Sequence, residues 1–205
     1  MTRRIEYFFS LASPWSFLGH DRLMALAGRT GAEVVVRPVA LGPVFAETGG
    51  LPLAKRAPAR QHLLLVELQR WRLKLGLDFH IHPQHWPFDA SLADRLVIAA
   101  VLDGHSVAAL VPRLFSGIWQ KQENLGDPAV LARLADEVGL PGAALLTRAD
   151  EADVVAAYAT NHALALENEV FGAPSYVLDG EVFWGQDRLE LLEDALTSGR
   201  APFTP

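Results

Sequence analysis

The chain has 205 residues, half of them hydrophobic, which is enough for one large domain or two small ones with a sizeable core. Its net charge of −6, from 18 Lys and Arg against 24 Asp and Glu, argues against a nucleic-acid partner and against an anionic membrane surface. It has no cysteine, which excludes disulfides, thiolate metal sites and a cysteine nucleophile, so any sulfur chemistry must come from a bound thiol.

The first forty residues predict a strand, a helix and a second strand. Residues 5–9 are aromatic and strand-like. Ser13 and Pro14 have the pattern of a helix N-terminus, with serine as the cap and proline in the first helical position. This helix should run to about Thr30 and end at the following glycine. Residues 33–38 form the next predicted strand.

Between about residue 40 and residue 168 apolar side chains recur at helical spacing. Residues 41–58 hold three prolines and three glycines, and we expect a loop or a boundary there. The predicted helices cover residues 59–76, 91–102, 107–120, 127–139 and 149–169, the last with room for one break.

The C-terminal segment predicts a hairpin followed by a helix. Asp179 and Gly180 lie between two apolar runs, and such a pair favours a tight turn because both residues need a positive φ. Pro174 opens the first strand, where its missing N–H costs no central ladder bond. The final helix should cover residues 188–196. We therefore predict an α/β domain built from the two ends of the chain, with a helical insertion.

Four segments, residues 13–18, 68–71, 170–174 and 184–189, together resemble 2-hydroxychromene-2-carboxylate isomerases, which belong with the kappa-class glutathione transferases and the DsbA-like thioredoxin fold. The resemblance covers essentially the whole chain. It implies a thioredoxin-like sheet from residues 1–40 and 169–205, an all-helical insertion at 41–168, a homodimer, and glutathione as cofactor. The implied reaction isomerises 2-hydroxychromene-2-carboxylate reversibly to trans-o-hydroxybenzylidenepyruvate, a step in aromatic catabolism.

Ser13 stands where thioredoxins place their nucleophilic cysteine, so the resemblance makes it the catalytic residue. The free N–H groups and the dipole of a helix N-terminus add about half a positive charge, which favours a glutathione thiolate beside the Ser13 hydroxyl. The plainer interpretation is an N-cap serine with no further role. Two positions depart from the family pattern: Ser10 replaces an acidic residue, and Gly49-Gly50 replaces Gly-Asn.

The resemblance assigns the rest of the glutathione site to the C-terminal segment. It implies a cis Pro174, although X-Pro bonds are cis in only about 5–6% of cases and the residues alone favour trans. The Ala173 backbone would then pair with the cysteinyl backbone of glutathione like an added strand. Asp187 would hold the γ-glutamyl amino group, and the Gln186 and Asp187 amides its carboxylate. Asp187 and Glu190 also match a capping box, and one carboxylate can serve both roles.

The three histidines within residues 80–85 are spaced as metal ligands could be. Two nearby prolines break the segment, however, and no helix or strand period holds the imidazoles together. We therefore expect no metal and favour a loop near the aromatic substrate, with Trp86 and Phe88 as apolar walls.

These observations predict a glutathione-dependent isomerase that works by reversible addition of the thiol to a substrate double bond. A kappa-like glutathione transferase or peroxidase would need the same thiolate site with a more open pocket. A non-catalytic thioredoxin-fold binding protein would need no glutathione. The missing cysteines rule out a DsbA-like dithiol oxidant. No apolar run approaches about 18 residues and no signal peptide is evident, so we expect a soluble, cytoplasmic protein.

Overall fold

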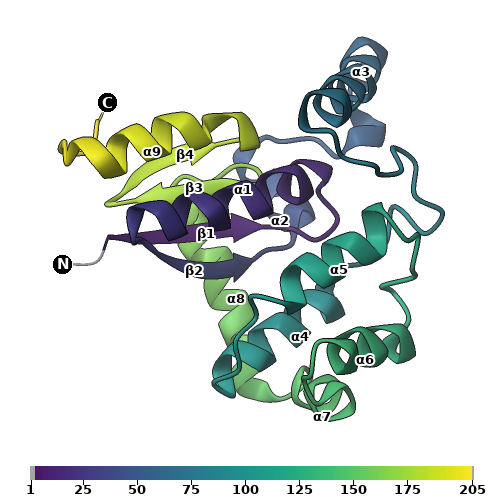
Figure 1. Ribbon diagram of the computed structural model, residues 1–205. Helices are drawn as coiled ribbons and strands as arrows, with labels where there is room; N and C mark the ends of the chain where they lie inside the picture. The colour runs from purple at the N-terminus through teal and green to yellow at the C-terminus, as the bar shows by residue number, and fades with distance from the viewer. Residues whose placement is uncertain (1–2, 205) are drawn as a thin grey trace.

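The computed structural model describes residues 3–204, and its centre is a four-stranded sheet in the order β2-β1-β3-β4 (Figure 1). Strands β1 (Arg4–Phe9) and β2 (Glu33–Pro38) are parallel. Strand β3 (Ser175–Leu178) runs antiparallel to β1, and β4 (Glu181–Trp184) antiparallel to β3. The two ends of the chain therefore form one sheet, which confirms the predicted α/β architecture.

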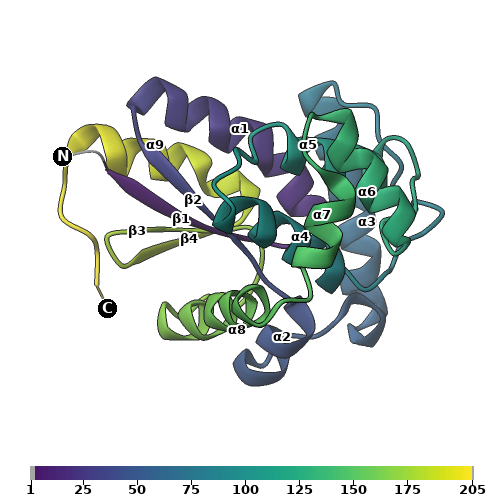
Figure 2. The ribbon, with the colours of Figure 1, turned by 90° about the horizontal axis from the view of Figure 1, so that it is seen from below.

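Helices cover both faces of this sheet. Figures 1 and 2 show α1 (Pro14–Thr30) and α9 (Leu189–Ser198) on one face and α8 (Ala152–Glu167) on the other. Because successive strand residues point to opposite faces, Tyr7 packs in the core on the α1 side while Phe8 packs in a second cluster with Ala165 of α8.

The remaining helices come from the middle of the chain. They are α2 (Leu41–Thr48), α3 (Pro58–Leu75), α4 (Ser91–Leu102), α5 (Leu110–Trp119), α6 (Pro128–Glu137) and α7 (Gly142–Arg148), with short 3₁₀ turns at Leu53–Lys55 and Gln186–Arg188. In Figure 1, α4 to α7 cluster beside the sheet, and α3 stands apart from them. The domain boundaries at 41 and 168 stay a prediction, since α8 lies inside that segment yet covers the sheet.

Local capping chemistry sets several boundaries as predicted. Ser13 caps α1 by accepting a hydrogen bond from the Ser16 N–H, and Pro14 occupies the first turn. Asp127 caps α6 in the same way through the Ala129 N–H. In the hairpin between β3 and β4, Asp179 has φ 52° and Gly180 has φ 86°, so the tight turn is confirmed.

For the middle of the chain, one prediction was wrong and one helix was missed. The expected loop at 41–58 contains α2, because Pro43 lies in the first turn, where a missing N–H is tolerated. The expected helix at 149–169 is confirmed as α8, whereas the short helix α7 that precedes it was not predicted. A Cβ at Gly142 would lie 2.0 Å from the Ala132 carbonyl oxygen, so α7 begins where only glycine lets the chain approach α6. Among residues 3–204, no helix combines the length and apolarity that crossing a membrane requires.

Candidate active site

The Ser13 side chain links the N-terminal and C-terminal parts of the fold at the start of α1. It is 4% exposed. Its Oγ accepts the Ser16 N–H at 3.2 Å and donates to the Ala173 carbonyl oxygen at 3.2 Å. The Ser13 N–H donates to the Ser10 carbonyl oxygen at 3.0 Å. The hydroxyl thus lies between the positive end of a 17-residue helix and a backbone segment 160 residues away.

The second backbone segment is built around Pro174. The Ala173–Pro174 peptide is cis, as the resemblance implied and as the residues alone did not. The Pro174 carbonyl oxygen accepts the Gly185 N–H at 2.9 Å, which fixes the chain after β4 beside the chain before β3. The structure therefore brings Ser13, Ala173 and the 185–187 turn to one end of the sheet.

Gln186 and Asp187 occupy that turn in different ways. Gln186 is buried, and Arg22 of α1 donates to its backbone carbonyl oxygen at 3.0 Å and to its side-chain Oε1. The Oε1 and the carbonyl oxygen of Gln186 are therefore both paired with Arg22. The half-exposed Asp187 carboxylate accepts from Arg188 at 2.5 Å and folds over Gly185. Gly185 has φ 107°, and a Cβ there would lie 2.5 Å from Asp187 Oδ1.

The capping role predicted for Asp187 is wrong. Helix α9 begins at Leu189 after a 3₁₀ turn over Gln186–Arg188, and neither of these helices has a side-chain cap. Asp187 therefore lies inside the 3₁₀ turn. Only a residue directly in front of α9 would meet the free N–H groups of that helix. Its carboxylate instead pairs with Arg188 and is partly exposed to solvent.

Trp86 and Phe88, the two residues predicted to bind substrate, have different surroundings. Trp86 Nε1 donates to the Ala12 carbonyl oxygen at 2.9 Å, and Trp119 Nε1 donates to the Leu11 carbonyl oxygen at 3.4 Å. These indoles hold the loop that leads from β1 to Ser13. Phe88 lines a cavity of about 300 Å³ beside the same loop, whereas Trp86 is absent from the described residues that line it.

This cavity also contains residues that the sequence did not single out. It is bounded by Ser10 and Ala12, by the first turn of α2, by residues 88–91, and by Asp94 of α4 and Tyr158 of α8. Asp94 is fully buried, and its Oδ2 accepts a hydrogen bond from the Tyr158 hydroxyl at 2.8 Å. Burial raises the pKa of Asp94 to about 8, and the charge of Asp89 adds to this effect.

Asp94 was not predicted as a site residue, and its sequence position suggests a simpler role at the helix N-terminus. Ser91 and Asp94 fit the capping-box spacing, which assigns such an acid to the helix terminus. In the structure α4 has Ala90 as its N-cap and no side-chain cap, so the carboxyl group is free for Tyr158. The two residues are 64 positions apart, and no local pattern connects them.

The histidine segment, residues 80–85, lies in the loop between α3 and α4. His80 and His82 are exposed, and the His80 N–H donates to the Trp119 carbonyl oxygen at 2.7 Å. Within residues 3–204, no group of three or more His, Cys, Asp or Glu side chains is arranged to hold a metal ion.

Comparison with known proteins identifies the fold family. Residues 4–197 match the model of the DSBA-like thioredoxin domain. The chain belongs to this family. The DSBA-like chain is 29% identical over 198 residues to 2-hydroxychromene-2-carboxylate isomerase of Sphingobium xenophagum, covering 96% of this chain and 99% of that one.

Two further comparisons agree with this assignment. Glutathione S-transferase kappa 1 of Rattus norvegicus is 24% identical over 202 residues, covering 93% of this chain and 89% of that one. A solved structure of a selenomethionine 2-hydroxychromene-2-carboxylate isomerase superposes with a TM-score of 0.83 at 24% identity, covering 95% of both chains. The resemblance to these isomerases and the DsbA-like thioredoxin fold are thereby confirmed.

Proposed function

We propose that this DSBA-like protein is a glutathione-dependent isomerase of 2-hydroxychromene-2-carboxylate or a related aromatic catabolite. The observation that carries the proposal is the position of the Ser13 hydroxyl, 3.2 Å from the Ala173 carbonyl oxygen at the N-terminus of α1. With no cysteine in the chain, this end of the helix can stabilise a sulfur anion but cannot supply one. The similarity to named isomerases over nearly the full length supports the same reaction class.

The residues around Ser13 fit a peptide thiol. The hydroxyl can turn its proton from Ala173 toward an anion, and the Ala173 backbone lies beside it for pairing with an extended peptide. The Asp187 carboxylate is half exposed and suits an ammonium group, while the main chain of Gln186 and Asp187 suits a carboxylate. Bound glutathione would supply a nucleophilic sulfur that adds reversibly to the substrate double bond.

The alternative is a kappa-like glutathione transferase or peroxidase. The relative named glutathione S-transferase kappa 1 favours it, since it spans nearly the same length of chain. Both activities would use Ser13 and the thiol in the same way. They differ in whether the thiol leaves again with the substrate isomerised or stays attached to it.

We also propose that the protein forms a homodimer and is located in the cytoplasm.

The Ser13→Ala variant tests the proposed function. Removing one donor to an anionic centre costs on the order of 100-fold in rate. We therefore expect the kcat/KM for isomerisation of 2-hydroxychromene-2-carboxylate to fall about 100-fold, and glutathione to bind more weakly by calorimetry. The matched control is Ser106→Ala, an exposed serine in the connection between α4 and α5, which should leave both quantities unchanged.

Unchanged turnover in Ser13→Ala, or turnover by the wild type without glutathione, would contradict the proposal. Conjugation of glutathione to a dinitrohalobenzene faster than isomerisation of the chromene would select the transferase instead.

A further inference from the structure

The cavity beside the Ser13 loop contains a carboxyl group that the proposed function leaves without a role. Asp94 lies in the first turn of α4, and Tyr158 reaches it from α8. Asp94 Oδ1 is buried and has no hydrogen-bond partner among residues 3–204. Buried polar atoms are almost always paired in proteins, so an unpaired one in the wall of a 300 Å³ cavity points to a ligand.

The surroundings of Asp94 hold it in the acid form at neutral pH. Burial raises its pKa to about 8, and Asp89 raises it further, while the Tyr158 hydrogen bond and Arg95 act in the opposite direction. Arg95 directs its guanidinium to the Ala149 carbonyl oxygen and to Asp150, so it does not pair with Asp94. Because the Tyr158 hydroxyl donates to Oδ2, the acid proton is carried by Oδ1.

The lining of the cavity sets the charge of what it can bind. It includes two carboxyl groups, Asp89 and Asp94, and the residues described as its lining include no Lys, Arg or His. Phe88, Leu41 and Pro43 supply apolar walls. An ionised carboxylate buried here would meet no cationic side chain, only the partial positive charge at the N-termini of α2 and α4, and it would lie beside two acidic groups. A neutral oxygen on an aromatic skeleton would gain a donor without that cost.

We propose that Asp94 is a substrate-binding residue whose acid proton donates to the carbonyl oxygen of an aromatic enone, and that neutral enones are preferred over enones carrying a carboxylate. The proposal rests on the proposed function and, within it, favours related aromatic catabolites that lack a carboxylate over 2-hydroxychromene-2-carboxylate itself. In a reversible addition to such an enone, the π electron pair moves onto the carbonyl oxygen, where the Oδ1 proton meets it. When the bond to sulfur breaks, the pair returns to carbon and the proton to Asp94, with no net oxidation.

Two matched probes test this proposal: o-methoxybenzylideneacetone, a neutral enone, and o-methoxybenzylidenepyruvate, the corresponding keto acid. The methyl ether removes the phenol, so neither probe titrates between pH 6 and 9.5. Calorimetry without glutathione measures the binding of the trans probes, and turnover of the cis probes with saturating glutathione gives kcat/KM. We expect the wild type to favour the ketone by about tenfold or more, with affinity falling about tenfold per pH unit above pH 8 as Asp94 ionises.

Two variants separate this role from a structural one. Asp94→Asn keeps a donor that cannot ionise, so the fall above pH 8 should vanish. Tyr158→Phe removes a hydrogen bond that lowers the pKa of Asp94, so the fall should move to higher pH. The control Asp89→Asn should move it slightly to lower pH. If Asp94→Asn does not fold, the direction of the Tyr158→Phe shift alone decides.

A preference for the keto acid, or a fall above pH 8 that persists in Asp94→Asn, would overturn the assignment. Failure of the proposed function has a different signature. In that case neither probe turns over and glutathione does not bind, while the pH-dependent binding of the ketone and its loss in Asp94→Asn still support the Asp94 site.

Discussion

His20 is a buried residue of α1 whose chemistry is determined by packing. Its ring lies 5.5 Å from that of Phe115 and 5.8 Å from that of Tyr7. Burial lowers the pKa of His20 to about 4, although Asp21 acts in the opposite direction. Its Nδ1 has no partner within residues 3–204. His20 is therefore neutral at pH 7 and serves the core between α1, α5 and the sheet.

The variant His20→Leu tests this at the level of stability. Below its unfolded pKa of about 6.5 the unfolded chain binds a proton that the folded chain refuses, so wild-type stability falls as pH drops from about 6.5 to 4. The 2.5-unit shift corresponds to roughly 3 kcal/mol over this window. In His20→Leu that share of the loss should be absent, as measured by urea unfolding at pH 7.5 and pH 4.5.

Asp94→Asn is the matched control, because the raised pKa of Asp94 has the opposite sign. The folded chain keeps a proton on Asp94 up to pH about 8, so this residue makes the protein less stable as pH rises from about 4 to 8. Asp94→Asn should therefore steepen the acid loss that His20→Leu flattens. Identical pH dependence in His20→Leu and the wild type would contradict the buried neutral histidine.

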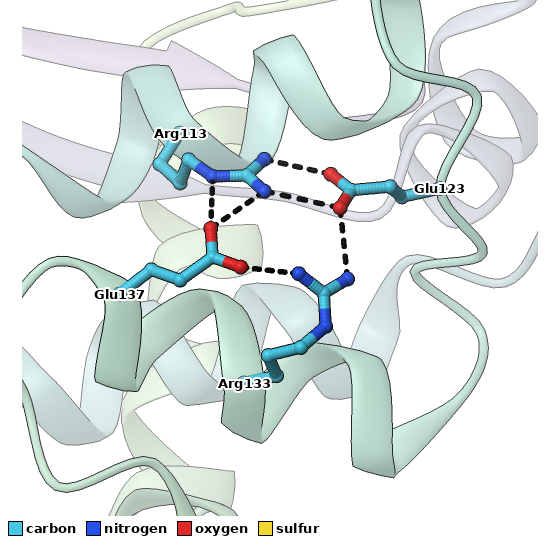
Figure 3. A network of polar contacts seen from close by, with 4 residues as sticks. All are labelled: Arg113, Glu123, Arg133 and Glu137. Carbon is cyan, nitrogen blue, oxygen red and sulfur yellow. Dashed lines mark hydrogen bonds and ion pairs between the residues drawn. The ribbon is translucent and has the colours of Figure 1, made fainter.

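Among the elements, α5 and α6 are joined by a network of four charged side chains (Figure 3). Arg113 of α5 donates to both carboxylate oxygens of Glu123, at 2.7 and 3.0 Å, and also contacts Glu137 of α6 at 2.7 Å. Arg133 of α6 donates to Glu123 at 2.8 Å and to Glu137. Hydrogen bonding by Arg113 lowers the pKa of Glu123 to about 2, so this carboxylate stays ionised.

Arg113→Met removes the least exposed cation of the network while keeping the apolar stem. Glu123 then retains only Arg133, and we expect the free energy of unfolding to fall by about 2 kcal/mol, less than for a fully buried pair because the network reaches solvent. Urea unfolding at pH 7 measures the loss. Arg72→Ala, which breaks an exposed ion pair with Asp78, should change stability by less than about 0.5 kcal/mol. Equal effects of the two variants would contradict a structural role for the network.

Elements with local signals were predictable from the sequence, and those that depend on distant partners were not. The caps at Ser13 and Asp127 and the Asp179–Gly180 turn act within a few residues, so they appear in the sequence as patterns. Helix α2 was missed because its proline and flanking glycines look like a loop until the first turn and the C-cap are seen in place.

The residues of the candidate site fall into the same two groups, those that the sequence indicated and those that depend on distant partners. The resemblance led to Ser13, Ala173 and Pro174, and the structure places them together. The pairing of Arg22 with Gln186 spans 164 positions, and neither side chain carries a signal for the other. The same holds for Asp94 of α4, because its pKa depends on its burial and on the hydrogen bond from Tyr158 of α8.

For the whole molecule, α3 presents a second apolar face. Leu64, Leu68 and Trp71 lie toward the core, whereas Leu63, Val66 and Leu73 are exposed, with Leu73 at 85%. The exposed side chains follow helical spacing and share one face of the helix. Figure 1 shows α3 standing away from the other helices, so this face is open to a second copy of the chain.

The proposed homodimer can be tested with Leu73→Glu. If α3 forms the two-fold interface, a charge at this position is repeated on both copies and should shift the protein from dimer to monomer. Light scattering after size exclusion measures the mass. Leu191→Glu, which charges an exposed leucine on α9, should leave the mass at twice that of one chain. A dimer that survives Leu73→Glu would place the interface elsewhere, and a monomeric wild type would refute the dimer.

The central position of β1 has a consequence for how the chain is made. Its partner on one side, β2, leaves the ribosome soon after it, but its partner on the other side, β3, begins only at Ser175, far along the chain. At 5–20 residues per second, this edge of β1 waits roughly 10–30 s for its antiparallel neighbour. Until then a hydrophobic strand edge is unprotected, so nascent chains stalled before residue 175 should be the ones most in need of chaperones.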